Sequence, residues 1–267
     1  MTMQNKKDIK PKEPKLEQLL AEGVVVERRW LYDQGFKRST VDYFLRSGKL
    51  VKVGRGAYRR PGPPLKWQHL YYSLQILGYN LHVGGKTALN LQGFSHYLPL
   101  GGNKEVIELY GKEKPPKWLF EYEGNFEFLY RKEKDFDTLP PESLTNIAFG
   151  HWDWQLRIST AELALMELVA YVEEEADFYL VDRYFESVTV LRADLLFTLL
   201  QKCKHIRTRR LFLWFANRHH HRWFDKIEKE KIPLGSGKRV IVKNGTLDKS
   251  YQITVPREMA ENDVAFF

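Results

Sequence analysis

The chain has 267 residues, of which 43% are hydrophobic, so it is long enough for two domains and apolar enough to bury a core. No apolar run approaches the roughly 18 residues that cross a bilayer, and no apolar stretch follows the N-terminal lysines, which excludes a signal peptide and favours a cytoplasmic protein. The single cysteine, Cys203, excludes an internal disulfide and a zinc site built on cysteines.

Positive charge is concentrated in two separate parts of the sequence. The formal net charge is +8 for the whole chain, and by region it is +8 for residues 1–62, −8 for 63–201 and +9 for 202–239. Segregated positive charge attracts polyanions. The pattern therefore predicts a polyanionic partner and leaves its identity open.

The first elements in chain order predict a basic arm and three short helices. Residues 1–14 are rich in lysine and proline and lack apolar periodicity, which is typical of a disordered arm. A helix over 15–22 follows, ended by Gly23, and after a valine run a second helix covers 27–34. A third helix begins near Ser39 or Thr40 and ends at Gly48. Short helices joined by short turns are the skeleton of a helix-turn-helix domain.

Directly after the third helix, the sequence predicts a β-hairpin. Two short alternating segments, 50–53 and 57–60, are joined by a Gly-Arg-Gly turn in which glycine allows the positive φ of a tight hairpin. A hairpin in this place is the wing of a winged helix. Prolines at 61, 63 and 64 then mark a boundary, so we expect a DNA-binding domain at 15–62 and a second domain at 63–267.

Cations and small polar residues surround the predicted third helix and wing. Phosphates attract such a set without sequence preference, and base edges supply specificity. Thr40 and Tyr43 are candidates for base or sugar contacts, and Arg55, at the wing tip, for a minor groove. The predicted DNA-binding residues are Lys37, Arg38, Ser39, Thr40, Tyr43, Arg46, Lys49, Lys52, Arg55, Arg59 and Arg60.

The remainder of the chain predicts a mixed α/β domain. Helices are expected at 65–78, 161–172, 178–188 and 191–203, with a short helix after the glycines at 84 and 85. Strands are expected at 105–111, 126–132 and 152–158, and Ser159 and Glu162 have the spacing of a capping box. The segments 238–245 and 250–256 resemble a closing hairpin. The predicted fold class is α+β, with an N-terminal winged helix-turn-helix and a larger mixed α/β C-terminal domain.

Four segments in order resemble the AbiEi antitoxins of bacterial type IV toxin–antitoxin systems. They are "GKLVKVGRGAYRRPG", "HVGGKTALNLQGFSHYLP", "LRISTAELALMELV" and "PLGSGKRVIVKNGTLDKSYQITVP", and together they extend over nearly the whole chain. The resemblance implies a repressor whose winged helix binds inverted repeats in its own promoter. It also implies a C-terminal antitoxin domain that counters a nucleotidyltransferase-like AbiEii toxin without a stable complex.

Two motifs that suggest nucleotide chemistry are incomplete. A phosphate-binding loop ending in Gly85, Lys86 and Thr87 needs a glycine at position 80, where Asn80 stands, and Thr87 is expected to cap a helix instead. A nucleotidyltransferase site at Gly235 and Ser236 lacks the paired carboxylates that hold magnesium. We therefore predict no catalytic residue, cofactor or metal, and a nuclease or transferase is the least favoured class.

The second basic region, residues 202–239, allows two interpretations. At helical spacing one stripe can gather basic side chains around an aromatic ring, which suits a nucleic-acid backbone and stacked bases. The alternative is a core tryptophan beneath a solvated basic face, and the histidine run at 219–221 is expected at a solvated or DNA-facing helix end. The candidates for a second nucleic-acid or antitoxin surface are Arg207, Arg210, Trp214 and Arg218.

The sequence thus predicts a non-enzymatic repressor and antitoxin. The alternative is a winged-helix regulator whose second domain senses a ligand or a partner and which has no toxin. The gene adjacent to this one distinguishes the two, because only the first requires a neighbouring toxin.

Overall fold

The computed structural model describes residues 15–94, 104–150 and 153–261, and the predicted arm at 1–14 lies outside them. Contacts divide the chain into two compact units. The first unit contains the described residues up to Tyr79 together with Pro115–Gly124, and the second contains Asn80–Lys114 and the described residues from Asn125 onward.

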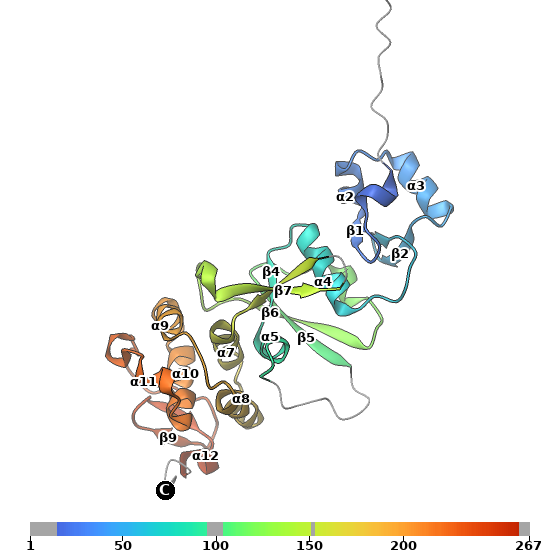
Figure 1. Ribbon diagram of the computed structural model, residues 1–267. Coiled ribbons are helices and arrows are strands. Elements are labelled where there is room, and N and C mark those ends of the chain that lie inside the picture. The colour runs from blue at the N-terminus through green and yellow to red at the C-terminus, as the bar shows by residue number, and fades with distance from the viewer. Residues whose placement is uncertain (1–14, 95–103, 151–152, 262–267) are drawn as a thin grey trace, which may run out of the picture. The chain divides into compact units, whose positions relative to one another are not determined.

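The first unit is a winged helix with two added helices (Figure 1). Its sheet has the order β1-β3-β2 and is antiparallel throughout. The winged helix-turn-helix is confirmed, with one addition: the valine run forms a third strand, which pairs with β3. The elements are α1 (Leu16–Leu19), β1 (Val25–Glu27), α2 (Arg28–Asp33), α3 (Arg38–Arg46), β2 (Val51–Gly54), β3 (Ala57–Arg59), α4 (Trp67–Ile76) and α6 (Lys117–Phe120).

Two helices outside residues 15–62 complete the core of the first unit. The buried backbone N–H of Val25 donates to Ser73 Oγ of α4 at 2.8 Å, and Trp118 Nε1 of α6 donates to Glu27 Oε1 at 3.0 Å. Tyr79 also donates to Glu27 Oε1, at 3.0 Å. The domain boundary placed at residue 62 stays a prediction, since the contact units divide at Tyr79 and the first includes 115–124.

A five-stranded mixed sheet organises the second unit, with the order β6-β5-β4-β8-β7. Strands β4 and β8 are parallel, as are β5 and β6, while the other two pairs are antiparallel. The predicted strands at 105–111 and 126–132 are confirmed, and β4 and β7 were not predicted. The strands are β4 (Leu81–Val83), β5 (Glu105–Gly111), β6 (Phe126–Lys132), β7 (Leu144–Phe149) and β8 (Trp154–Ser159), and α5 (Gly85–Leu91) follows β4.

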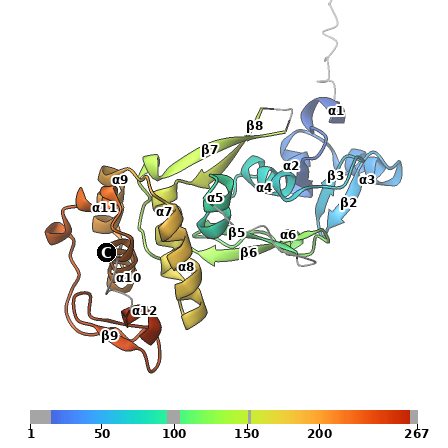
Figure 2. The ribbon, with the colours of Figure 1, turned by 60° about the horizontal axis from the view of Figure 1, so that its bottom comes forward.

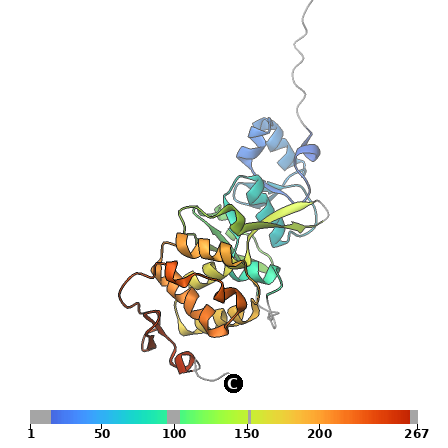
Figure 3. The ribbon, with the colours of Figure 1, turned by 60° about the vertical axis from the view of Figure 1, so that its left-hand side comes forward.

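Helix α7 (Ala161–Ala170) is the centre of the helical part, and every one of its residues is buried. A helix that is apolar on all sides needs neighbours on all sides, and Figure 2 shows α7 between α5 and α10. The outer helices group together in Figure 3. They are α8 (Glu175–Ser187), α9 (Ala193–Lys202), α10 (Ile206–His219) and α11 (Arg222–Asp225), with 3-10 turns at Pro141–Ser143 and Lys229–Lys231.

The predictions for the cap of α7 and for the first arm of the closing hairpin are wrong. Thr160, not Ser159, is the N-cap residue of α7, because Ser159 ends β8 and its hydroxyl donates to the buried carboxylate of Glu167 at 2.8 Å. The closing hairpin pairs β9 (Thr246–Asp248) with β10 (Ile253–Val255), ahead of α12 (Arg257–Glu261), so its first arm lies after the predicted 238–245. Among the described residues no helix is both long and apolar enough to cross a membrane.

Candidate nucleic-acid interface

Helix α3 presents a basic and polar face because its two buried residues lie on one side. Val41 is fully buried and Phe44 is 8% exposed, and the Phe44 ring packs edge-on against Phe36 at 5.5 Å. The opposite side of the helix therefore faces solvent, and Tyr43 keeps 52% of its surface exposed. The exposed side chains of this face are Lys37, Arg38, Ser39, Tyr43 and Arg46.

The wing adds three exposed cations beside this helix: Lys49, Lys52 and Arg55. Gly56 has a φ of +79°, which the turn requires. Gly54 is required for space instead, because a Cβ there would lie 2.8 Å from Trp118 Cβ of α6. Helix face and wing together form the winged-helix basic surface: Lys37, Arg38, Ser39, Tyr43, Arg46, Lys49, Lys52 and Arg55.

Three other predicted residues are engaged within the unit itself. Arg59 donates to the carbonyls of Pro63 and Gly62 at 2.7 and 3.1 Å, and Arg60 donates to the carbonyl of Leu20 at 3.3 Å. Thr40 is half-buried and already has an interaction partner. The two arginines fix the segment that follows the wing, so a DNA phosphate would have to compete with these carbonyls.

Arg28 is a residue of this site that the sequence analysis missed. Its guanidinium donates to Asp42 Oδ1 on α3 at 3.1 Å and lies 5.7 Å from the Tyr58 ring centroid on β3. Hydrogen bonds to Tyr58 and Tyr32 raise the pKa of Arg28. Arg28 thus connects α2, α3 and the wing strand. No spacing rule brings residues 28, 42 and 58 together, so only the fold could reveal this arrangement.

The predicted second surface is not a surface, and the exposed-stripe interpretation is corrected. Arg210 and Trp214 are each 2% exposed. The Arg210 guanidinium donates to the carbonyls of Leu234, Gly235, Gly237 and Gln252 at 2.6–3.2 Å. These carbonyls belong to the segment after α11, so Arg210 attaches that segment to α10.

The other two arginines of the stripe also act internally. Arg207 donates to the carbonyls of Ala170, at 3.2 Å, and Val172. Arg218 donates to Asp182 Oδ1 at 3.2 Å and to the carbonyl of Met259 at 2.6 Å, and its guanidinium lies 5.0 Å from the Trp214 ring centroid. Burial lowers the pKa of Arg207 and Arg210. The alternative interpretation is therefore right that Trp214 is a core residue. It is wrong about the arginines, which bind groups within the unit and do not form a solvated basic face.

The histidine run likewise makes contacts inside the second unit. His219 lies 2.9 Å from Asp182 Oδ1, and His221 Nε2 lies 2.7 Å from the carbonyl of Phe185. His220 has a φ of +47° and ends α10. No cluster suited to a metal ion occurs among the described residues.

Carboxylates occupy the position that a phosphate takes in a phosphate-binding loop. The backbone N–H of Gly85 donates to Glu167 Oε2 at 2.9 Å, and that of Lys86 donates to Glu108 Oε2 at 2.8 Å. A Cβ at Gly85 would collide with Glu108. Thr87, predicted to cap α5, instead accepts from the Glu108 backbone N–H at 3.0 Å, and Gly84 is the N-cap residue of α5. Two carboxylates at the start of α5 therefore take the backbone N–H groups of Gly85 and Lys86 that a phosphate would need.

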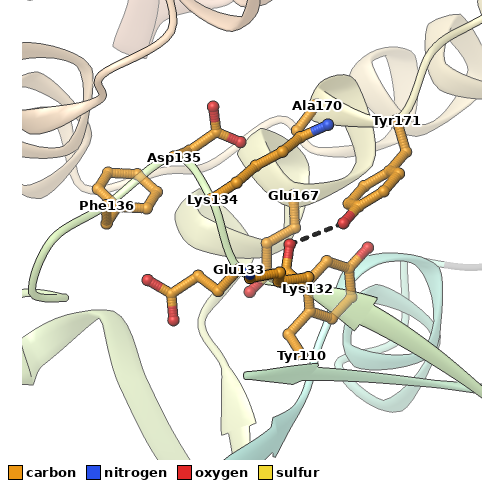
Figure 4. A pocket seen from close by; sticks show the side chains of 9 residues that line it. All are labelled: Tyr110, Lys132, Glu133, Lys134, Asp135, Phe136, Glu167, Ala170 and Tyr171. Carbon is orange, nitrogen blue, oxygen red and sulfur yellow. Dashed lines mark hydrogen bonds between the residues drawn. The ribbon is translucent and has the colours of Figure 1, made fainter. Parts of the chain in front are cut away.

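A small polar cavity lies next to these acids (Figure 4). Its volume is about 10 Å³, which is room for a water molecule. His82 Nε2 lies 2.5 Å from Glu167 Oε1, and Tyr171 donates to the carbonyl of Lys132 at 2.7 Å, the dashed line in Figure 4. The buried Oε1 of Glu133 has no hydrogen-bond partner among the described residues. This arrangement is a buried polar network rather than a cleft for a substrate.

Comparison with known proteins gives matches along most of the chain. The model of a family described as transcriptional regulator, AbiEi antitoxin, type IV TA system matches residues 104–256, and the model of the AbiEi antitoxin N-terminal domain matches residues 10–100. The crystal structure of the RV2827C protein from Mycobacterium tuberculosis has a TM-score of 0.54 at 14% identity, and the alignment covers 87% of this chain and 86% of that one. At that identity the likeness shows a shared fold alone. No curated protein matches the chain.

Proposed function

This chain belongs to the AbiEi antitoxin family of transcriptional regulators in type IV toxin–antitoxin systems, and from that premise we propose that it represses its own operon by binding promoter DNA through its winged helix. The winged-helix basic surface is the observation that carries the proposal. It combines a helix that can enter a major groove with a hairpin that can reach an adjacent groove.

The exposed residues divide into two roles. Lys37, Arg46, Lys49 and Lys52 supply positive charge for phosphates, which gives affinity without sequence preference. Ser39 and Tyr43 lie on the exposed face of α3, where hydroxyl groups can contact base edges or sugars. Arg55 at the wing tip suits a narrow minor groove. An operator with inverted repeats would bring two copies of this surface to the DNA.

The antitoxin role is proposed from family membership. The toxin would be an AbiEii-like nucleotidyltransferase from the neighbouring gene, and the chain would counter it without a stable complex and without catalysis of its own. A repressor of its own operon acts where the DNA is, in the cytoplasm. The second unit, matched by the larger family model, is our candidate for this role.

Two experiments with the full chain test these proposals. Fluorescence anisotropy should show tighter binding to the chain's own promoter than to a scrambled duplex of equal length, with affinity falling steeply as salt rises. Equal affinity for both duplexes would contradict the proposal that the chain recognises its operator. Co-expression with the neighbouring gene should restore growth that the neighbour alone suppresses, and continued growth arrest would remove the antitoxin role.

A second candidate function is a regulator whose second unit senses a small molecule. An open cavity of about 270 Å³ in that unit favours it. The co-expression experiment separates the two candidates, because a regulator without a toxin would rescue nothing. If co-expression rescues nothing, the open cavity of the second unit is the candidate regulatory site.

A further inference from the structure

The larger cavity of the second unit has an apolar wall and a charged end. Leu129 of β6, Leu168 of α7 and Leu180 and Val181 of α8 supply the apolar side chains, and its volume is about 270 Å³. This volume is close to the lower end of the range for small-molecule sites. Leu129 and Leu180 are 37% and 40% exposed, so the apolar wall is open to an incoming molecule.

Arg131 is the unusual group at the charged end. A guanidinium has five N–H donors, yet that of Arg131 makes no hydrogen bond to any residue the structure describes, and its Nε is buried. Its nearest carboxylate oxygen, Glu108 Oε1, lies 3.6 Å away, which is beyond hydrogen-bonding distance. The guanidinium packs on the Tyr171 ring at 4.2 Å from the centroid. Stacking holds the guanidinium in place while its donors stay unused.

The cavity contains a second cation. Lys86 lines it, and its ammonium forms no hydrogen bond or ion pair with the described part of the chain. Its backbone N–H, by contrast, is used by Glu108.

The two acids in the cavity wall are satisfied within the protein. Glu108 Oε2 accepts from the Lys86 backbone N–H at 2.8 Å. Asp177 Oδ2 accepts from the backbone N–H groups of Glu173 and Glu174 at 2.8 and 3.0 Å. Glu108 Oε1 is also the ion-pair partner of Arg131 at 3.6 Å, so a ligand carboxylate would share the Arg131 guanidinium with Glu108 and would have the Lys86 ammonium beside it. Because the Arg131 side chain lines the cavity and is 28% exposed, its unused donors are accessible there, and beside an apolar wall they indicate a ligand with an acidic head and a hydrocarbon tail.

We propose that this cavity binds a small amphipathic carboxylate, with its head at Arg131 and Lys86 and its tail along Leu129, Leu168, Leu180 and Val181. The planar guanidinium matches a carboxylate with two parallel hydrogen bonds. The proposal does not rest on operator binding or on the antitoxin role, because all of its residues belong to the second unit.

Hexanoate is a suitable probe because it has a carboxylate head and a short hydrocarbon tail. Titration calorimetry with the full chain should detect hexanoate binding, weaker binding of acetate, which has no tail, and none of hexylammonium, which has the same tail and the opposite charge. This comparison uses the unmodified protein and so does not depend on any variant folding. Equal binding of hexanoate and hexylammonium, or no hexanoate binding at millimolar concentration, would overturn the proposal.

Three variants locate the site. Arg131→Gln should weaken hexanoate binding by about tenfold or more, the loss expected for one charge-assisted pair. Leu180→Asp, on the exposed wall, should weaken it because it places a negative charge beside the tail. Lys202→Met, at an exposed position on α9 outside the cavity lining, is the matched control and should bind as the unmodified chain does. Unchanged affinity in Arg131→Gln would assign hexanoate to another site.

Discussion

The two basic parts of this protein use their cations in opposite ways. In the winged helix, cations on α3 and the wing stay exposed, while in the 202–239 region Arg207, Arg210 and Arg218 point at carbonyls and a carboxylate of the same unit. Both regions have almost the same net charge, so net charge alone does not locate a nucleic-acid surface. What separates them is how many sides of the helix are buried.

The apolar pattern of each helix explains the difference. In α3 the buried residues are Val41 and Phe44, one turn apart, so the other faces remain free for cations. In α10 nine consecutive residues from Thr208 to Ala216 are buried; Arg210 is one of them, and the half-buried Arg207 and Arg218 flank the run. A buried cation is stable only when it is paired or hydrogen-bonded, so these arginines hold neighbouring segments together.

Replacing the buried Arg210 should have the largest effect, on the stability of the second unit. Arg210→Met should lower the free energy of unfolding by roughly 3 kcal/mol or more, because each buried carbonyl left without a donor costs about 1–3 kcal/mol. The melting temperature should fall by about 6–12 °C, at about 2–4 °C per kcal/mol for a chain of this size. Differential scanning calorimetry measures both, and operator affinity at a temperature where the variant is folded should not change. A variant that keeps wild-type stability but binds DNA more weakly would mean that Arg210 contacts DNA and does not stabilise the second unit.

Replacing an exposed cation of the wing should have the next largest effect, on operator binding. Arg55→Ala should weaken operator binding by roughly 1–3 kcal/mol if the wing tip reads a base or a narrow groove. Stability should not change, because the backbone N–H of residue 55, which donates to Glu121 Oε2 at 3.3 Å, is kept in alanine. Anisotropy titrations measure the affinity, with Lys226→Ala in the second unit as a control. Wild-type affinity in Arg55→Ala would mean that the wing does not touch the DNA.

A smaller effect concerns Arg28, which is partly buried and belongs to the exposed region. Arg28→Met removes the contact between Asp42 of α3 and Tyr58 of the wing strand, so the helix should be held less firmly relative to the wing. We expect the ratio of operator to scrambled-duplex affinity to fall by about tenfold, or roughly 1.4 kcal/mol, and Arg28→Lys to restore part of it. If both duplexes lose affinity equally, Arg28 contributes charge and does not position α3.

The smallest effect tests the cost of buried charge in the second unit. Burial raises the pKa of the Glu133 carboxyl above its usual 4.5, and Glu167 and Asp135 raise it further. Because the folded pKa is raised, the stability contribution of Glu133 is present below the unfolded pKa and is lost as pH rises through the folded pKa. Glu133→Gln should therefore melt about 2 °C higher than wild type at pH 8 and at the same temperature as wild type at pH 4. An equal difference at both pH values would exclude this carboxyl as the cause.

The sequence was most informative where local pattern decides the structure. Helix α3, the wing and the strands at 105–111 and 126–132 follow from the periodicity of their own residues, and all are confirmed. The same reasoning could not find the burial of Arg210 or the role of Arg28, because both depend on partners 14 or more residues away. It misplaced the cap of α7 because Ser159 is required by Glu167, a contact between a strand end and the helix interior. Residue type predicted local conformation, whereas partners distant in sequence decided which cations remain exposed.

The central claim is that the winged-helix basic surface, and not the 202–239 region, neutralises DNA phosphates. The slope of log affinity against log salt for operator binding tests it directly, in full-length chains that carry three substitutions to alanine. Replacing Lys37, Arg46 and Lys49 should reduce the magnitude of the slope by about 2–3, at about 0.9 per phosphate contact. Replacing Lys202, Lys226 and Lys238, which are equally exposed in the second region, should leave the slope unchanged. A slope that falls as much with the second set as with the first would contradict the claim.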